Sequence, residues 1–195
     1  MKILCVSDIH DDKKVLKKID EAIEKHGIDV MINAGDFLDK KDAKKYFGKL
    51  KIKTFFVHGN WDNNIQTDNK NVSIMKNEIE EFMGYYFVGL DSRFIIIEEV
   101  FKYTKDIPSE KMILITHEPP FGILDTTWIG NNAGFLEFRE LAETKKPILH
   151  VFGHIHESAG YANHEGTLFV NAAINDSGIM YIVDLPSRKI TEIKI

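Results

Sequence analysis

The sequence predicts an α/β fold in which parallel strands alternate with helices, within a single domain over residues 1–195. Apolar runs of strand length alternate with helical patterns between Lys2 and Val57, and such alternation implies parallel pairing through right-handed crossovers. A chain of 195 residues is long enough for one sizeable core and short for two. Since no linker, low-complexity tract or internal repeat divides the chain, we expect one domain.

The N-terminal part predicts three strands and two helices in alternation. The strands are apolar runs at Lys2–Val6, Ile28–Asn33 and Ile52–Val57. The first helix is expected between an N-cap at Asp11–Asp12 and a stop at Gly27, because apolar residues recur there with helical spacing. The second is a lysine-rich helix over Asp42–Phe47, and the polar stretch Asn63–Asn71 is expected to be loop.

The rest of the chain alternates less regularly. Clear patterns predict two apolar strands and one helix, at Met112–Thr116, Ile148–Phe152 and Phe135–Thr144. Glu78–Phe82 is expected to be helical and Tyr85–Leu90 to be a strand, while Phe94–Lys105 fits either state. Three short strand-like runs, separated by Gly, Asn, Asp and Pro turns, end the chain at Leu168–Asn171, Gly178–Val183 and Lys189–Ile195.

Composition and charge narrow the classes of protein. With 44% hydrophobic and 28% charged residues the chain is typical of soluble globular proteins, and no apolar run approaches the roughly 18 residues of a membrane span. The N-terminus enters a strand without a signal-peptide pattern, and the single Cys5 cannot form an intramolecular disulfide, so we expect a cytoplasmic location. A net charge of −5 argues against a broad nucleic-acid-binding face, and the paired lysines are expected on solvated helix faces.

Two histidines follow the last clear apolar strand, in the motif Gly153-His154-Ile155-His156. Glycine tolerates backbone angles that other residues avoid, so the chain can turn there and direct both imidazoles to one place. Neutral imidazole nitrogens suit a borderline transition metal. A His-x-His pair alone is weak evidence, because a hydrogen-bonded polar turn would explain it as well.

Side chains with oxygen or nitrogen donors follow every clear strand. In a sheet of this kind ligands gather beyond the carboxyl ends of the strands, so these donors are expected at one edge. Their number exceeds the needs of one tetrahedral ion, and a site for two ions about 3.5–4 Å apart, bridged by a carboxylate, would use them all. The seven donors are Asp8, His10, Asp36, Asn60, His117, His154 and His156.

Five motifs, in this order, resemble those of the calcineurin-like metallophosphoesterases: Asp8-Ile9-His10, Gly35-Asp36, Gly59-Asn60-Trp61-Asp62, His117 and Gly153-His154-Ile155-His156. The stretches Thr116–Asp125 and Phe152–Glu157 are similar to a subgroup, the small metallophosphoesterase-domain phosphodiesterases. The resemblance implies a four-layer α-β-β-α sandwich, with two mixed sheets packed face to face and helices outside. The strand-like runs that end the chain would belong to the second sheet.

The resemblance also implies roles for the donors. One divalent ion would be held by Asp8, His10 and His156, the other by Asn60, His117 and His154, and Asp36 would bridge them. Imidazole with carboxylate suits Mn, Fe, Zn, Ni or Co. The implied reaction is hydrolysis of a phosphoester by in-line attack of a metal-bridging hydroxide, and the implied catalytic residues are Asn60, Asp62 and His117.

One departure from the family concerns the residue after Asn60. Many members have histidine there, placed to protonate the leaving group or to hold a phosphoryl oxygen, whereas this chain has Trp61, whose indole N–H can donate but cannot act as an acid. Because unassisted alkoxide departure is slow, we expect better turnover of activated aryl or cyclic phosphodiesters than of alkyl phosphomonoesters. His58 is a less favoured substitute acid, and Asp62 is expected to orient the loop.

The function expected from these residues is a phosphodiesterase acting on a small-molecule or nucleotide phosphoester. A phosphomonoesterase would be expected to have the missing histidine and cationic side chains in the motifs, and a nuclease to have a basic groove or a further domain. A metal-free scaffold of the same fold would lack ligands, and all seven are present.

Several residues outside these motifs can be interpreted as structural or as functional. His150 is expected in the core or behind a metal ligand. His26 is expected at a helix C-terminus, and His164 in a surface turn. Glu118 either accepts the N–H of a metal-bound histidine or is exposed. The irregular stretch Pro119–Gly134 is expected to form a substrate wall. Asn171 and Asn175 could contact substrate, but turn formation is the favoured interpretation. No role is assigned to Arg93.

Overall fold

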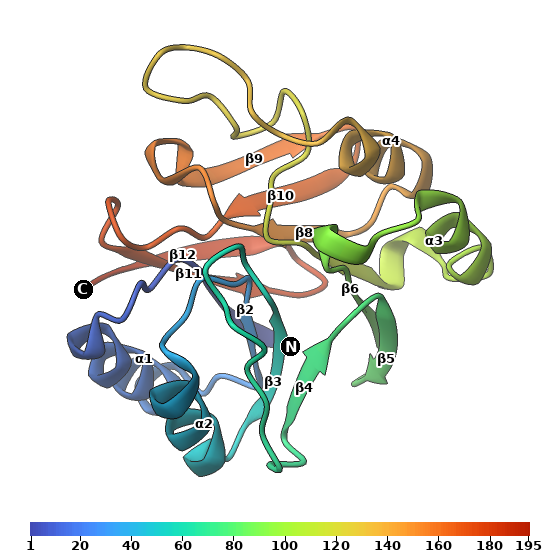
Figure 1. Ribbon diagram of the computed structural model, residues 1–195. Coiled ribbons are helices and arrows are strands. Elements are labelled where there is room, and N and C mark those ends of the chain that lie inside the picture. Colours follow the sequence, from blue (N-terminus) through green and yellow to red (C-terminus); the bar gives the residue numbers. More distant parts are fainter.

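The computed structural model describes residues 1–195 and consists of two six-stranded sheets stacked face to face, with helices on the outer faces (Figure 1). Buried side chains of both sheets form the core between them. Phe55 of the first sheet stacks on Phe87 of the second, with ring centroids 4.0 Å apart. The expected four-layer α-β-β-α sandwich is confirmed. None of the helices is both long and apolar enough to cross a bilayer.

The first sheet has the strand order β12-β11-β1-β2-β3-β4. The strands β1 (Lys2–Val6), β2 (Val30–Asn33), β3 (Lys53–Val57) and β4 (Val72–Met75) pair in parallel. Strand β11 (Ile179–Asp184) pairs antiparallel with β1 and with the edge strand β12 (Lys189–Lys194). Two helices, α1 (Lys13–His26) and α2 (Lys40–Lys49), bury residues such as Ile19 and Phe47 against its outer face. Both helices begin at aspartate N-caps, Asp12 and Asp39, whose carboxylates accept backbone N–H groups.

The second sheet has the strand order β5-β6-β7-β8-β10-β9. Its four central strands are parallel and its two edge strands antiparallel. The strands are β5 (Glu78–Phe82), β6 (Tyr85–Gly89), β7 (Met112–Ile115), β8 (Leu149–Phe152), β9 (Gly160–His164) and β10 (Thr167–Asn171). Two helices, α3 (Ile97–Tyr103) and α4 (Leu136–Lys145), cover its outer face, with Leu114 and Phe138 fully buried between.

The segment Glu78–Phe82 was expected to be helical, and that prediction was wrong, because it forms the edge strand β5. Met83 (φ 50°) and Gly84 (φ 79°) connect it to β6, and two positive φ angles in succession are what tight hairpin turns require. Strand alternation directs Ile79 to the helix-covered face and Phe82 to the core between the sheets. Pairing with β6 thus outweighs the helix propensity of the glutamates.

The last two strand-like runs, Gly178–Val183 and Lys189–Ile195, were expected in the second sheet, and that expectation was also wrong. They form β11 and β12 of the first sheet, where β11 pairs with β1 and removes what would otherwise be an open edge. Leu168–Asn171 does join the second sheet, as part of β10. The ambiguous stretch Phe94–Lys105 contains the helix α3, and β4 and β9 are strands that were not predicted.

Candidate metal centre

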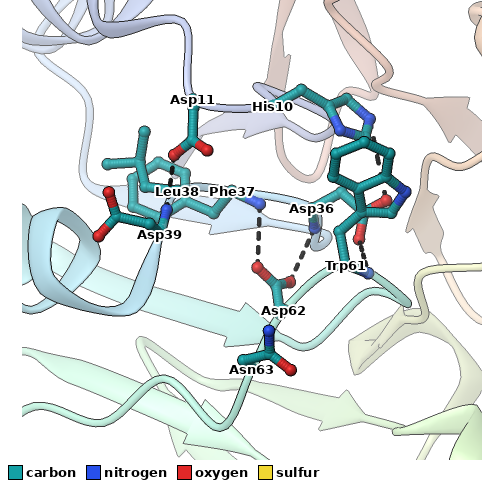
Figure 2. A pocket seen from close by; sticks show the side chains of 9 residues that line it. All are labelled: His10, Asp11, Asp36, Phe37, Leu38, Asp39, Trp61, Asp62 and Asn63. Atoms are coloured by element: carbon teal, nitrogen blue, oxygen red, sulfur yellow. Dashed lines mark hydrogen bonds and ion pairs between the residues drawn. The ribbon is translucent and has the colours of Figure 1, made fainter.

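The loops that follow β1, β2 and β3 lie side by side at one edge of the sandwich (Figure 2). The backbone N–H of Asp8 donates to Gly35 O (2.9 Å), and that of His10 donates to Asp36 O (3.1 Å). The buried carboxylate of Asp62 accepts three further backbone N–H groups, from Asp36 (2.8 Å), Phe37 (3.1 Å) and Gly59 (2.7 Å). Asp62 therefore holds the loop after β2 against its own loop after β3.

Asp62→Ala is expected to lower both stability and activity. Three N–H groups would lose their acceptor, and since each buried unsatisfied group costs roughly 1–3 kcal/mol, we expect a loss on the order of 3 kcal/mol or more. Urea unfolding measures this loss, with Asp106→Ala, an exposed aspartate before β7, as the control. Wild-type stability and activity in Asp62→Ala would contradict the positioning role.

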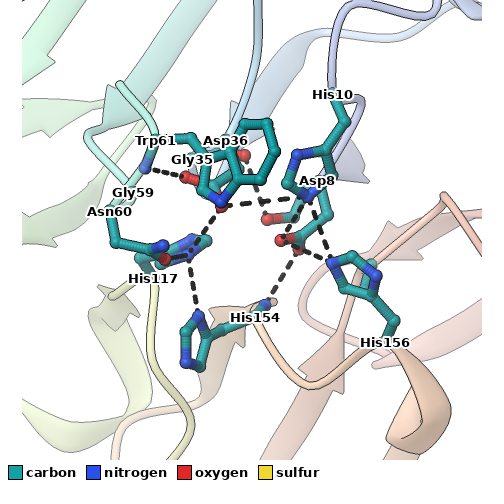
Figure 3. A network of polar contacts seen from close by, with 12 residues as sticks. Asp8, His10, Gly35, Asp36, Gly59, Asn60, Trp61, His117, His154 and His156 are labelled. Atoms are coloured by element: carbon teal, nitrogen blue, oxygen red, sulfur yellow. Dashed lines mark hydrogen bonds and ion pairs between the residues drawn. The ribbon is translucent and has the colours of Figure 1, made fainter. Parts of the chain in front are cut away.

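The structure brings all seven sequence-predicted donors together beyond these loops (Figure 3). They come from five strand ends, β1, β2, β3, β7 and β8. Four of them have the left-handed backbone conformation, namely Asp8 (φ 55°), His10 (46°), Asp36 (51°) and His154 (70°). Such angles are uncommon outside glycine, cost energy, and cluster at functional sites. The backbone that carries these donors therefore lowers the stability of the fold.

Two glycines of the motifs are required by close approach. A Cβ atom on Gly59 would overlap the carboxylate of Asp36, and one on Gly153 would overlap the carboxylate of Asp8. Neither glycine has a positive φ, so the requirement is for space and not for backbone conformation. The glycines let both carboxylates lie against the backbone of the neighbouring loop.

One group of donors surrounds the fully buried carboxylate of Asp8. Its Oδ1 lies 3.2 Å from His156 Nε2 and 3.7 Å from His10 Nε2. Its Oδ2 accepts the backbone N–H of His154 (2.9 Å). The Nε2 atoms of His10 and His156 lie 3.2 Å apart and face each other.

A second group surrounds the buried imidazole of His117. Its Nε2 lies 3.1 Å from Asn60 Oδ1 and 3.2 Å from His154 Nδ1. Its Nδ1 lies 2.8 Å from the carbonyl of Ala34; because a carbonyl only accepts, Nδ1 carries the hydrogen and leaves Nε2 facing the group. Asp36 lies between the two groups, with Oδ2 3.4 Å from His117 Nε2 and 3.8 Å from His10 Nε2.

These separations fit ligands of transition-metal ions. Two donors bound to one ion at about 2.1 Å lie about 3.0 Å apart in octahedral geometry and about 3.4 Å apart in tetrahedral geometry. The pairs His10–His156, His117–His154 and His117–Asn60 lie 3.1 to 3.2 Å apart. Where both facing nitrogens are unprotonated they repel each other, and a cation bound between them would account for the arrangement.

The charges of the two groups are coupled. Burial alone would raise the pKa of Asp8, but hydrogen bonds from His10 and His156 outweigh it and hold that pKa well below its ordinary value. Burial alone would lower the pKa of His117, but the carboxylates of Asp36 and Asp8 raise it to about 9. An ion with its positive charge would replace the proton on this imidazole, so metal binding is expected to release protons.

His58, the substitute acid considered from the sequence, begins the loop after β3. It is buried, its ring meets that of Phe56 with centroids 5.1 Å apart, and neither ring nitrogen has a hydrogen-bond partner. Burial and the nearby Arg93 guanidinium lower the pKa of His58 to about 4. It forms no hydrogen bond to any of the seven donors.

Arg93, to which no role was assigned, lies beside the same loop. Its guanidinium pairs with both oxygens of the buried Asp91 (2.8 and 2.6 Å) and donates to the backbone carbonyl of Asp62 (3.3 Å). In the sequence, only Asp91, two residues earlier, could have indicated an ion pair of Arg93. The contact with Asp62 arises because the end of β6 packs beside the end of β3. Arg93 thus links the second sheet to the site loop.

Two buried polar residues lie behind the centre. His150 is a core residue, as expected, with Nε2 2.9 Å from Thr116 Oγ1 and its ring against those of Phe152 and Phe169. Glu118 is buried and so is not solvent-exposed, and the N–H of the adjacent His117 goes to Ala34 instead.

The remaining residues considered from the sequence lie away from the centre. His26 ends α1, His164 ends β9 and accepts a hydrogen bond from Arg139 (2.9 Å), and Asn175 lies in an exposed turn.

The irregular stretch Pro119–Gly134 borders the turn that carries His156. The backbone N–H of Trp128 donates to Glu157 (2.7 Å), and Ser158 donates to the carbonyl of Thr126 (2.7 Å). Asn171 was expected in a turn, but it ends β10, and its Nδ2 joins the same two segments by donating to the carbonyls of Leu124 (3.1 Å) and Ile155 (2.9 Å). This stretch is therefore placed to form a wall of the site.

The fold and its edge define the chain first as a protein of the metallophosphoesterase fold. A solved structure described as a novel archaeal phosphodiesterase superimposes with a TM-score of 0.66 at 18% identity over 100% of both chains. The protein TT1561 of Thermus thermophilus superimposes with a TM-score of 0.75 at 16% identity, over 99% of this chain and 98% of that one. At such identities the likeness concerns the fold alone.

The family follows from the sequence comparison. The model of the calcineurin-like phosphoesterase superfamily domain matches residues 1–173, so the chain belongs to the calcineurin-like phosphoesterase superfamily, whose members are metal-dependent phosphoester hydrolases. UPF0046 protein K07C11.7 of Caenorhabditis elegans is 25% identical over 91% of this chain and 71% of its own length. Human metallophosphoesterase domain-containing protein 1 is 43% identical to this chain over the matched region. The matched region covers 43% of this chain and 28% of the human protein.

Proposed function

We propose that the protein is a phosphodiesterase that hydrolyses small or nucleotide-like phosphodiesters with two divalent transition-metal ions from the set Mn, Fe, Zn, Ni and Co. The supporting observation is the position of Asp36, whose Oδ2 lies within 3.8 Å of an imidazole nitrogen of each donor group. One ion would be held by Asp8, His10 and His156, the other by Asn60, His117 and His154, and Asp36 would bridge them.

When bound, the two ions would offset charge on the phosphoryl oxygens and make water a nucleophile at neutral pH. The chain's own residues supply the geometry that in-line displacement needs. The Ala34 carbonyl fixes the tautomer of His117, and Asp62 holds the Asn60–Trp61 loop against Asp36. Trp61 supplies an indole at the rim, which can donate a hydrogen bond to the leaving group but no proton.

The surroundings of the centre favour a diester over a monoester. A monoester carries a second negative charge, which proteins usually meet with arginine or lysine. Neither donor group contains such a residue, and the guanidinium of the neighbouring Arg93 is already occupied by Asp91 and the Asp62 carbonyl. A singly charged phosphodiester matches this site better.

Removal of metal is expected to abolish hydrolysis of bis(4-nitrophenyl) phosphate. The purified protein is expected to contain about two ions per chain, and activity is expected to return when Mn²⁺ or another ion of the proposed set is restored after chelation. Elemental analysis before and after chelation gives the ion count. Full metal occupancy without turnover would instead indicate a scaffold.

An activated diester is expected to be a far better substrate than an alkyl phosphomonoester. The reason is the lack of an acid at Trp61, since general acid catalysis contributes roughly 10²–10⁴-fold to the departure of poor leaving groups. Comparing kcat/KM for bis(4-nitrophenyl) phosphate and glycerol 2-phosphate on the same metal-loaded sample measures the ratio. Similar values for the two compounds would exclude this account.

We also propose a cytoplasmic location and a small substrate. Cys5, the single cysteine, is a buried free thiol in β1, which suits a reducing compartment. A net charge of −5 disfavours long nucleic acids, because their binding requires many cationic contacts. We therefore expect a metabolite or a nucleotide as the substrate.

A further inference from the structure

A cavity of about 170 Å³ opens directly beside the metal centre, between the loops that follow β1, β2 and β3 (Figure 2). His10 and Asp36 line the cavity and belong to the donor groups, so the cavity and the centre are continuous. Figure 2 shows the indole of Trp61 on one side and the carboxylates of Asp11 and Asp39 on the other. A phosphodiester at the centre could therefore extend one of its two alcohol arms into this space.

Trp61 offers the cavity an aromatic surface that the protein itself does not cover. The residue is 69% exposed. Its backbone N–H donates to Asp36 Oδ1 (2.9 Å), and its ring meets that of His10 nearly at right angles, with centroids 4.8 Å apart. The indole is thus anchored to two of the proposed ligands, and a large apolar ring in such a place is suited to contact a bound group.

The opposite side of the cavity carries the carboxylates of Asp11 and Asp39, which form no ion pair and interact with Lys13 only at longer range. Asp11 Oδ1 accepts the backbone N–H of Asp39 (2.6 Å), and Asp39 Oδ1 accepts those of Lys41 (2.8 Å) and Asp42 (3.0 Å). The second oxygen of each of these two carboxylates has no protein partner, and neither forms an ion pair. The amino group of the nearby Lys13 pairs with Asp42 instead.

Resting on the phosphodiesterase function proposed above, we propose that the cavity binds an organic ammonium group carried by one alcohol arm of the substrate. A cation over an indole face is attracted by the ring quadrupole, and the carboxylates of Asp11 and Asp39 add Coulomb attraction. An uncharged arm of the same shape gains only the apolar contact, and an arm bearing a further phosphate is repelled. The substrate class is then amino-alcohol phosphodiesters.

Direct binding tests the cavity without relying on turnover. The chain has two tryptophans, so Trp128→Phe leaves Trp61 as the single emitter. In this background, with and without metal, choline is expected to change the fluorescence saturably, and 3,3-dimethylbutan-1-ol, its uncharged isostere, to bind at least fivefold more weakly. Equal affinity for the two compounds would overturn the proposal.

A double variant tests the carboxylates. In Asp11→Asn/Asp39→Asn the preference for choline is expected to disappear, because the shape stays and the charge is removed. Asparagine tolerates the left-handed backbone of Asp11 (φ 62°) and is a good N-cap at position 39, so the variant is expected to fold. Asp106→Asn/Glu110→Gln, two exposed acids before β7, is the charge-matched control. A preference that survives in the cavity variant, or that the control also loses, would count against the proposal.

Turnover provides the second measurement. The 4-nitrophenyl ester of phosphocholine is expected to exceed the 4-nitrophenyl 3,3-dimethylbutyl diester at least fivefold in kcat/KM, mainly through KM, and Trp61→Ala or the cavity variant is expected to bring the ratio toward one. Hydrolysis of both esters at equal rates would overturn the ammonium subsite and leave the phosphodiesterase in place. Selective choline binding without hydrolysis of either ester would support the subsite and refute the phosphodiesterase.

Discussion

Asp36→Asn is expected to remove metal from both positions and to lower kcat by roughly a thousandfold or more. Asparagine keeps the shape, tolerates the left-handed φ of 51°, and can still accept the N–H of Trp61. It lacks the charge of a carboxylate whose Oδ2 lies between His117 Nε2 (3.4 Å) and His10 Nε2 (3.8 Å). Both groups of donors therefore lose the same ligand.

Substitution of a single histidine is expected to remove fewer ions than Asp36→Asn does. His154 Nδ1 lies beside His117, and His156 Nε2 lies beside Asp8. Each of His154→Ala and His156→Ala is expected to lower the metal content by about one ion per chain in the two-ion arrangement. Elemental analysis after gel filtration gives the count, with His26→Ala, at the end of α1, as the control that keeps both ions. Loss of both ions from either single variant would point to one shared ion or to tight coupling between the two.

His150 is expected to make the fold sensitive to acid. Complete burial lowers the pKa of this histidine to about 3, whereas an unfolded histidine has a pKa near 6.5. Between these values the unfolded chain binds a proton that the folded chain does not, so stability is intact above pH 6.5 and falls as the pH is lowered toward 3. The slope is about 1.4 kcal/mol per pH unit, or on the order of 2 kcal/mol between pH 6.5 and 5.

The variant His150→Gln isolates this contribution. Glutamine can still bond with Thr116 Oγ1, which lies 2.9 Å from the imidazole Nε2, and it does not titrate. Urea unfolding of metal-free protein at pH 7 and pH 5 is expected to show a smaller loss in the variant than in the wild type. His26→Gln, at the end of α1, controls for removal of a histidine outside the core. Identical pH dependence in wild type and His150→Gln would refute the assignment.

The sequence predicted most of what is local in this fold. The buried strands β1, β2, β3, β7 and β8 are short apolar runs bounded by polar residues, and each donor lies two to four residues after the end of one of these strands. Five motifs in the order of the calcineurin-like metallophosphoesterases also predicted the four-layer fold and the convergence of the donors. The strand ends carry this information because parallel strands bring their carboxyl ends to the same edge.

What could not be predicted depends on contacts between distant segments. Glu78–Phe82 is a strand because β6 lies next to it, and its glutamates alone favour a helix. Arg93 reaches the site only because the ends of β6 and β3 are neighbours across the two sheets. The cavity beside Trp61 likewise needs Asp11 and Asp39 to face the same space from two different loops.

The pairing of β1 with β11 bears on the order in which the chain acquires its structure during synthesis. Ile3 lies opposite Val183, so one side of β1 stays open until Val183 has emerged, while its other side can pair early with β2. A chain halted at residue 173, where the family match ends, already holds every proposed ligand. It would nevertheless present β1, the strand that leads to Asp8 and His10, as an unpaired edge open to pairing with another chain. Completion of the ligand set and closure of the sheet that supports it therefore depend on different segments of the chain.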